Sequence, residues 1–113
     1  MQTVRLTVRV MAKGQGAFGP GKAALLEKIR SDGSISKAAQ SLDMSYSRAW
    51  QLVDSMNKAF HQPLVEPRSG GKKGGGAAIT KAGEEVLDLY RKLEGSLASV
   101  TGSFSAEFEK LLR

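Results

Sequence analysis

The first pattern of apolar and polar positions along the chain is an alternation near its start. In residues 3–11, apolar side chains alternate with threonine and arginine, and the apolar set that shares one face is Val4, Leu6, Val8 and Val10. This period of two predicts a half-buried strand with a basic outer face. Because a lone strand is unstable, we expect it to pair with strands at residues 64–80 or with its copy in a second subunit. The glycine-rich segment 12–21 is predicted to be a loop.

Helical spacing begins after this loop. Pro20 suits a first helical turn, and Asp32-Gly33 suits a helix end, because glycine readily adopts the left-handed conformation found there. Ser36 is expected to cap a short second helix, Asp43-Met44 to form a turn, and Ser45 to cap a third helix. The apolar stripes that these helices should bury are Leu25, Leu26 and Ile29, then Ala38, Ala39 and Leu42, and finally Ala49, Leu52, Val53, Met56 and Phe60.

A hairpin is predicted after the third helix. Residues 64–66 and 78–80 have strand character, and the sequence SGGKKGGG between them has five glycines in eight residues. Two helices joined by a tight turn at about residues 35–60, followed by a hairpin at about residues 64–80, form a winged helix-turn-helix. We therefore predict a mainly α fold with a small β wing (α+β) and the element order β-α-α-α-β-β-α. Residues 1–113 are interpreted as a single domain.

A long last helix is predicted over about residues 81–101, with Thr80 as its cap. Its apolar stripe contains Val86, Leu89, Tyr90, Leu93, Leu97 and Val100, and Phe104, Phe108, Leu111 and Leu112 extend it. Such a stripe exceeds what a terminal helix on a small domain can hide, so we interpret this helix as a dimerisation surface. The expected homodimer interface comprises Val4, Leu6, Val8, Leu89, Leu93 and Leu97.

Composition limits the classes of function. A net charge of +6 and an isoelectric point near 9.8 favour an anionic partner. Residues 1–81 carry 13 Lys and Arg against 5 Asp and Glu, whereas residues 82–113 carry 4 against 6, so the positive charge coincides with the helices and hairpin. The absence of cysteine and the single histidine exclude thiolate and histidine-rich metal sites. Without a signal peptide or a membrane-spanning apolar run, we expect a cytoplasmic protein that makes no membrane contact.

The exposed face of the third helix is the first candidate binding surface. The residues on it that we expect to contact DNA are Ser45, Tyr46, Ser47, Arg48 and Gln51. Arg48 and Gln51 can bond base edges, while Tyr46 and Ser47 can reach phosphates. Trp50, at the edge of the buried stripe, is expected to pack beneath the helix. An isolated helix of this kind would simply be solvated, but the preceding capped helix and the following wing favour double-stranded DNA.

The basic hairpin loop is the second candidate. Arg68, Lys72 and Lys73 accompany its glycines, and the loop exposes many backbone N–H groups. This composition favours a polyanion over an ordinary soluble hairpin tip. The residues expected to contact the DNA backbone are Ser34, Ser36, Lys37, Arg68, Lys72, Lys73 and Thr80.

Two other motifs indicate nucleotide binding or catalysis only superficially. Residues 14–19 fit GxGxxG, but no second parallel strand ending in an acid follows, so a dinucleotide site is rejected. Glu84 and Glu85 are adjacent in a first helical turn, where they complement the helix dipole. No catalytic set or metal site remains, so we predict that the protein is not an enzyme and has no cofactor.

These segments resemble the N-terminal DNA-binding domain of ModE-type, molybdate-responsive transcription regulators, which is related to the winged helices of LysR-type regulators. The matching elements, within about residues 20–95, are Ser45-Tyr46-x-x-Ala49-Trp50, Met56-Asn57, Leu64-Val65, Gly71-Lys72…Gly74-Gly75-Gly76 and Thr80-x-x-Gly83. The resemblance implies a homodimer on a palindromic operator, with the third helix in the major groove and the wing on the backbone. It also implies that the N-terminal strand joins the first and last helices in forming the dimer.

One departure from that family concerns the signal. Regulators of this type sense molybdate through C-terminal oxyanion-binding domains, whereas this sequence ends at Arg113. We therefore assign no residue to molybdate, and expect a stand-alone DNA-binding form or sensing by a separate partner or an unrecognised ligand. The sequence predicts a bacterial, sequence-specific transcriptional regulator. The alternatives are an architectural DNA-binding protein of low specificity and a winged helix used for protein–protein contact, which Arg48 and the cationic wing disfavour.

Overall fold

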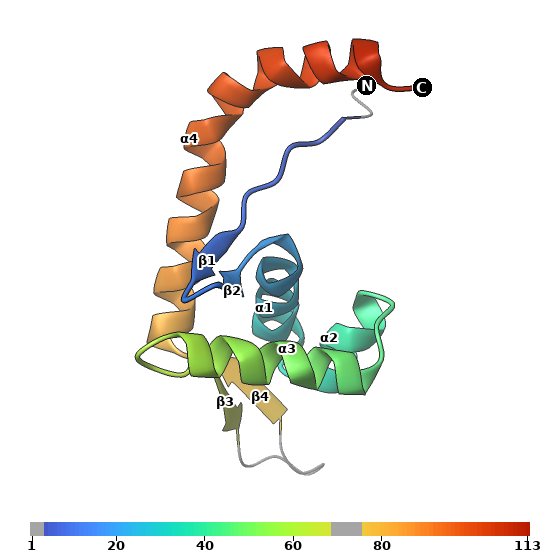
Figure 1. Ribbon diagram of the computed structural model, residues 1–113. Coiled ribbons are helices and arrows are strands. Elements are labelled where there is room, and N and C mark those ends of the chain that lie inside the picture. The colour runs from blue at the N-terminus through green and yellow to red at the C-terminus, as the bar shows by residue number, and fades with distance from the viewer. Residues whose placement is uncertain (1–3, 69–75) are drawn as a thin grey trace.

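The computed structural model describes residues 4–68 and 76–113, which form four helices and two small antiparallel sheets (Figure 1). In chain order the elements are β1 (Val10–Ala12), β2 (Gln15–Phe18), α1 (Pro20–Asp32), α2 (Ile35–Ser41), α3 (Tyr46–Ala59), β3 (Val65–Arg68), β4 (Gly76–Ile79) and α4 (Lys81–Leu111). The predicted class, mainly α with a small β wing, is confirmed.

The N-terminal region differs from its prediction. Residues 4–9 form no strand, and β1 pairs with β2, which lies within the segment predicted to be a loop. The turn between them has positive φ at both Lys13 (54°) and Gly14 (76°), as a type I′ hairpin turn requires. Lysine replaces the usual asparagine or aspartate in this turn, so the ordinary hairpin signal is missing. The element order therefore gains one strand. Of the two pairings predicted for the first strand, the one with the wing was wrong, and the one with a second subunit stays a prediction.

Helices α1, α2 and α3 pack around one apolar core. The three stripes predicted from helical spacing all face it, and within these stripes Leu42, Leu52 and Phe60 are half-buried. Strand β2 adds Phe18, whose ring packs edge-on against Phe60 at 6.3 Å and Tyr90 at 5.1 Å between ring centroids. The core thus joins the N-terminal hairpin, the helix-turn-helix and α4 in one unit.

The helix-turn-helix is formed by α2 and α3. The predicted cap of α2 is shifted by two residues, since the hydroxyl of Ser34, rather than that of Ser36, accepts the N–H of Lys37 at 3.2 Å. The turn residue Asp43 has a φ of 54°, a conformation that aspartate tolerates better than most residues. The hydroxyl of Ser45 accepts the N–H of Arg48 at 3.0 Å, which confirms the predicted cap of α3.

The wing is the antiparallel hairpin of β3 and β4, in register from Val65 opposite Ile79 to Arg68 opposite Gly76. Strand β4 is attached to the helices because Ala77 donates its N–H to the carbonyl of Gly33 at 3.0 Å. The tip of the predicted loop, residues 69–75, lies outside the described residues.

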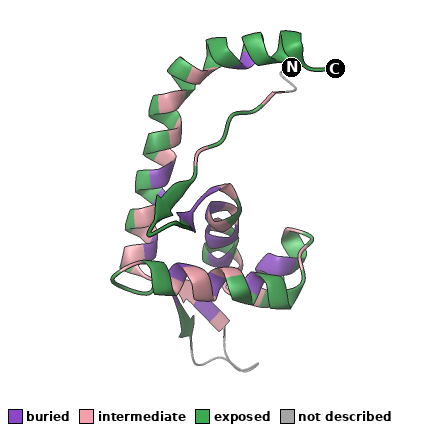
Figure 2. Cartoon of the chain, viewed as in Figure 1, coloured by how far each residue is buried: buried purple, intermediate pink, exposed green. Residues whose placement is uncertain are grey.

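Helix α4 is longer than predicted and continues through Gly102 to Leu111. It begins against Leu64, the residue before β3, where a Cβ added at Gly83 would lie 2.5 Å from the Leu64 carbonyl oxygen, so only glycine fits. Leu87, absent from the predicted stripe, and Tyr90 are buried, whereas Leu89 is 69% exposed. Figures 1 and 2 show the later turns of α4 bending across the top of the molecule with mostly exposed residues.

Candidate nucleic-acid interface

The first half of α3 presents the predicted recognition residues to solvent. Ala49, Val53 and Met56 anchor the opposite face of the helix in the core. Every residue predicted to contact DNA from this helix and its cap is exposed, namely Ser45, Tyr46, Ser47, Arg48 and Gln51. Each of these residues is therefore accessible to a ligand at the end of α3 that follows the turn.

The prediction that Trp50 packs beneath the helix was wrong. Its side chain is 46% exposed instead of packed beneath α3, and neighbouring Tyr46 is 53% exposed. On the helix, Trp50 lies between the buried face of Ala49 and Val53 and the exposed face, so the apolar spacing alone placed it on the wrong side. Two aromatic side chains thus join the accessible surface of this helix.

The start of α2 lies directly before the turn into α3. Ser34 is half-buried and its hydroxyl caps α2, while Ser36 and Lys37 are exposed. Arg68, at the end of β3, is also exposed. These residues retain access to a ligand on the side of the helix-turn-helix and wing.

The remaining residues predicted to contact the DNA backbone are Lys72, Lys73 and Thr80. Lys72 and Lys73 lie outside the described residues. The hydroxyl of Thr80 donates to the carbonyl of Pro63 at 2.7 Å and accepts the N–H of Gly83 at 3.0 Å. Thr80 therefore caps α4 and holds it against the segment before β3, so both hydrogen bonds of its hydroxyl have a structural role.

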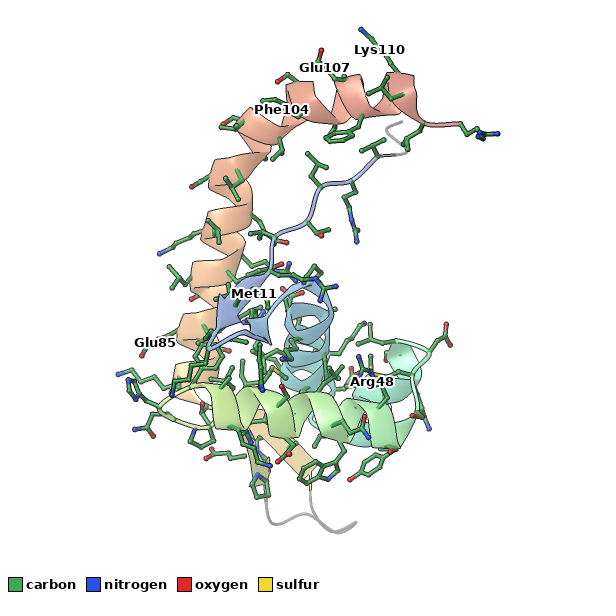
Figure 3. The ribbon with its side chains drawn as sticks, in the orientation of Figure 1. Met11, Arg48, Glu85, Phe104, Glu107 and Lys110 are labelled. Carbon is green, nitrogen blue, oxygen red and sulfur yellow. The ribbon has the colours of Figure 1, made fainter. Side chains whose placement is uncertain are left out.

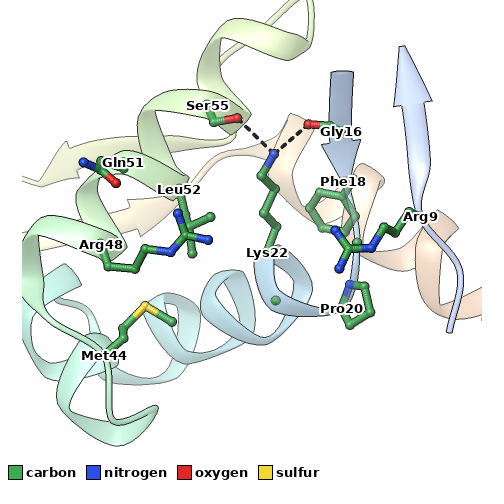
Figure 4. A pocket seen from close by; sticks show the side chains of 12 residues that line it. Arg9, Gly16, Phe18, Pro20, Lys22, Met44, Arg48, Gln51, Leu52 and Ser55 are labelled. Atoms are coloured by element: carbon green, nitrogen blue, oxygen red, sulfur yellow. Dashed lines mark hydrogen bonds between the residues drawn. The ribbon is translucent and has the colours of Figure 1, made fainter. Parts of the chain in front are cut away.

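A pocket beside α3 adds residues that the sequence did not indicate (Figure 4). It is lined by Arg9 from the N-terminal segment, Lys22 from α1, and Arg48 and Gln51 from α3. The Lys22 ammonium donates to the Gly16 carbonyl at 2.9 Å, the Ser55 hydroxyl at 2.9 Å and the Ala17 carbonyl at 3.5 Å. Burial, and then the Arg48 charge, lower the pKa of Lys22 below its ordinary value.

Most carboxylates with an ion pair in the described part of the chain lie on the other side of the molecule, between α1 and α4. Arg91 binds Glu27 at 2.6 Å and Glu94 at 2.7 Å, and Arg30 binds Glu84 at 3.3 Å. The hydrogen bonds that Arg91 donates to Glu27 and Glu94 raise the pKa of its guanidinium. Among the described residues that line the pocket, no acidic side chain accompanies Arg48 and Lys22.

The residues predicted to form a dimer interface gather along α4. Val4, Val8 and Leu97 are half-buried, whereas Leu6, Leu89 and Leu93 are exposed. The N-terminal segment follows α4, since Tyr90 donates its hydroxyl to the Val8 carbonyl at 2.7 Å. Figure 3 places Phe104, Glu107 and Lys110 at the far end of α4, remote from Arg48.

Two further properties concern membranes and metals. Across residues 4–68 and 76–113, no helix is both long and apolar enough to cross a membrane. The same residues contain no group of three acidic or histidine side chains placed to hold a metal ion.

Comparison with known proteins finds similarity over the helix-turn-helix and the wing. The family model for bacterial regulatory helix-turn-helix proteins of the LysR family matches residues 22–84. Molybdenum-pterin-binding protein MopB of Rhodobacter capsulatus is 39% identical over 95 residues, which are 84% of this chain and 35% of MopB. Transcriptional regulator ModE of Haemophilus influenzae is 44% identical over 75 residues, which are 66% of this chain and 29% of ModE. The resemblance stated from the sequence is thus confirmed.

A solved structure shares the fold. Full-length LysG of Corynebacterium glutamicum superposes with a TM-score of 0.55 and 25% identity, over 79% of this chain and 29% of LysG. The chain therefore spans about a third of the length of the relatives it matches. The matched residues 22–84 contain α1 from Lys22 onward, α2, α3, the wing and the start of α4.

Proposed function

Because the chain belongs to the LysR family of bacterial regulatory helix-turn-helix proteins, we propose that it binds double-stranded DNA sequence-specifically and regulates transcription. The observation that carries this proposal is the accessible first half of α3, which a capped α2 precedes and a basic wing follows. A 14-residue helix is about 21 Å long and fits the major groove, which is about 12 Å wide.

The proposed contacts divide by chemistry. Arg48 and Gln51 are assigned to base edges. The Arg48 guanidinium can donate hydrogen bonds to bases in the major groove, and the Gln51 amide can both donate and accept them. The residues assigned to phosphates are Ser45, Tyr46 and Ser47 on α3, Ser34, Ser36 and Lys37 at the start of α2, and Arg68, Lys72 and Lys73 in the wing. Thr80 is a weaker member of this set, since its hydroxyl already makes two hydrogen bonds.

We propose that the protein acts as a homodimer on a palindromic operator. The exposed apolar residues Leu6, Leu89 and Leu93 support this, because water disfavours such a surface on a monomer. A two-fold dimer places two copies of α3 on two inverted half-sites. We further propose a location in the bacterial cytoplasm, and that any effector is sensed by a partner outside this DNA-binding unit.

Selection of bound sites from random duplexes tests this function. We expect enrichment of two inverted half-sites whose centres are about 10 base pairs apart or a multiple of that spacing. The double variant Arg48→Ala, Gln51→Ala should bind duplexes without that enrichment. Equal retention of all sequences by the unchanged protein would instead identify an architectural DNA-binding protein, and retention of none would contradict DNA binding.

A further inference from the structure

The pocket beside α3 gathers positive charge from three separate parts of the chain. In Figure 4 the side chains of Arg9, Lys22 and Arg48 point into it from the N-terminal segment, α1 and α3, respectively. No aspartate or glutamate is among the described residues that line it. Three like charges around one hollow repel one another, so an anion placed between them would be strongly stabilised.

Lys22 fixes one wall of this pocket. All of its hydrogen-bond partners are uncharged, namely the carbonyls of Gly16 and Ala17 and the hydroxyl of Ser55. These bonds hold the ammonium in place but do not neutralise it. Lys22 therefore contributes a positioned charge and Arg48 a second one, while the guanidinium group of Arg9 supplies N–H donors in the planar arrangement that suits oxyanions.

The N-terminus of α1 contributes a second, independent feature. Gly19, Pro20 and Gly21 line the pocket, so the first turn of this 13-residue helix borders it. The N-cap residue Gly19 makes no side-chain capping bond, and the first turn contains no acid. The positive end of the helix dipole thus reaches the pocket without compensation from the chain itself.

We propose that this pocket binds a phosphate group, held by Arg9, by the charges of Lys22 and Arg48 and by the first turn of α1. Its volume of about 500 Å³ exceeds the needs of one such group, and it is open to solvent. The same chemistry accepts a free phosphate ion or a phosphate of the DNA backbone. The second source rests on the proposed function, whereas the first does not.

The test introduces a carboxylate into the pocket by Gly21→Asp. A Cβ at Gly21 meets no heavy atom within 4 Å, and an acid in a first helical turn complements the dipole, so this variant should fold with an unchanged or higher melting temperature. Gly95→Asp makes the same change at an open position on α4 and serves as the matched control. Arg9→Ala removes a donor without altering α3.

The first arm titrates each protein with inorganic phosphate and follows the amide NMR signals of Gly21 and Lys22. If the ion is bound free, these signals shift to saturation in the unchanged protein and in Gly95→Asp. Gly21→Asp should abolish the saturable shift, and Arg9→Ala should weaken binding about tenfold.

The second arm measures binding to a selected and a random duplex over a range of salt concentrations. If the pocket holds a backbone phosphate, Gly21→Asp should weaken both duplexes about tenfold relative to Gly95→Asp and lower the salt slope by about one. The proposal is overturned if phosphate produces no saturable shift and the two variants bind DNA alike with equal slopes. If no duplex is bound at all, the proposed function is wrong, and the phosphate titration alone then tests whether the pocket binds phosphate.

Discussion

At the scale of single residues, Asn57 joins the helix-turn-helix to the wing. Its side-chain amide donates to the Val65 carbonyl at 3.0 Å, and its oxygen accepts the N–H groups of Leu64 at 2.8 Å and Val65 at 3.1 Å. One side chain on α3 thereby satisfies three backbone groups at the start of β3. Asn57, noted in the sequence only as part of a family resemblance, has this structural role.

Asn57→Ala should destabilise the fold by about 1–3 kcal/mol, because partly buried backbone groups would lose their partners. Asn57→Asp should cost less, since it retains both acceptor bonds and loses only the donor. Urea unfolding measures both changes, with Gln40→Ala at an exposed position of α2 as the control. A loss for Asn57→Ala no larger than that for Gln40→Ala would contradict this role.

Arg48 and Arg68 should affect DNA binding differently. Arg48→Ala should weaken a selected operator by about 1–3 kcal/mol more than a random duplex, because a lost base contact reduces discrimination. Arg68→Ala should weaken both duplexes alike and lower the salt slope by about one, because a phosphate contact carries no sequence information. Fluorescence anisotropy at several salt concentrations measures both effects. Equal losses on both duplexes for both variants would refute this division.

At the scale of elements, the sequence predicted what depends on local signals. Helices α3 and α4 follow from apolar spacing and from the capping residues Ser45 and Thr80, and both caps are present. The β1–β2 hairpin was missed because Lys13-Gly14 is an unusual turn and the alternation before it suggested a longer strand. The phosphate pocket was missed because Arg9, Lys22 and Arg48 converge only in the folded chain.

The segment before β1 is held to α4 instead of to a strand. Tyr90 is buried and donates its hydroxyl to the Val8 carbonyl, and burial, with a smaller contribution from Glu94, raises the pKa of that hydroxyl above 10.0. A raised pKa in the folded state means that its stabilising contribution is complete below the unfolded value near 10 and is lost as the pH rises through the folded value.

Tyr90→Phe should therefore lower the free energy of unfolding by about 1 kcal/mol near neutral pH, through loss of one hydrogen bond. It should also remove part of the stability loss that the unchanged protein shows above pH 10. Chemical unfolding at pH 7 and at several values above 10 measures both effects. The exposed Tyr46 provides the control, because Tyr46→Phe should reproduce neither change. Parallel pH profiles for Tyr90→Phe and the unchanged protein would contradict the role of this hydroxyl.

At the scale of the whole molecule, the basic and apolar surfaces are separated. The radius of gyration is 16.1 Å, larger than the roughly 13 Å expected of a compact chain of this length, because α4 extends beyond the helical core. The exposed apolar residues Leu89, Val100 and Phe104 lie along α4, and Figure 3 shows Arg48 far from Phe104. Association through the apolar residues of α4 would leave the exposed residues of α3 uncovered in each copy.

Leu89→Glu tests this association. Because Leu89 is 69% exposed in one chain, it contributes little to the monomer core, and the variant should retain its fold by circular dichroism. If α4 forms the dimer, a buried glutamate at the two-fold interface should convert the protein to a monomer in sedimentation experiments. Operator affinity should then fall at least about 100-fold, because the two half-sites are no longer bound by linked copies.

The control for this variant places a charge change one position earlier. Asp88 is exposed on a different side of α4 from Leu89, so Asp88→Lys should leave the protein dimeric. An unchanged protein that sediments as a monomer, or a Leu89→Glu variant that remains a dimer, would remove the apolar face of α4 as the interface. If the dimer persists in the variant while operator binding is lost, Leu89 acts on DNA binding by another route. If the Leu89→Glu variant stays a dimer, the exposed apolar residues Leu6 and Val10 of the N-terminal segment are the next residues to substitute.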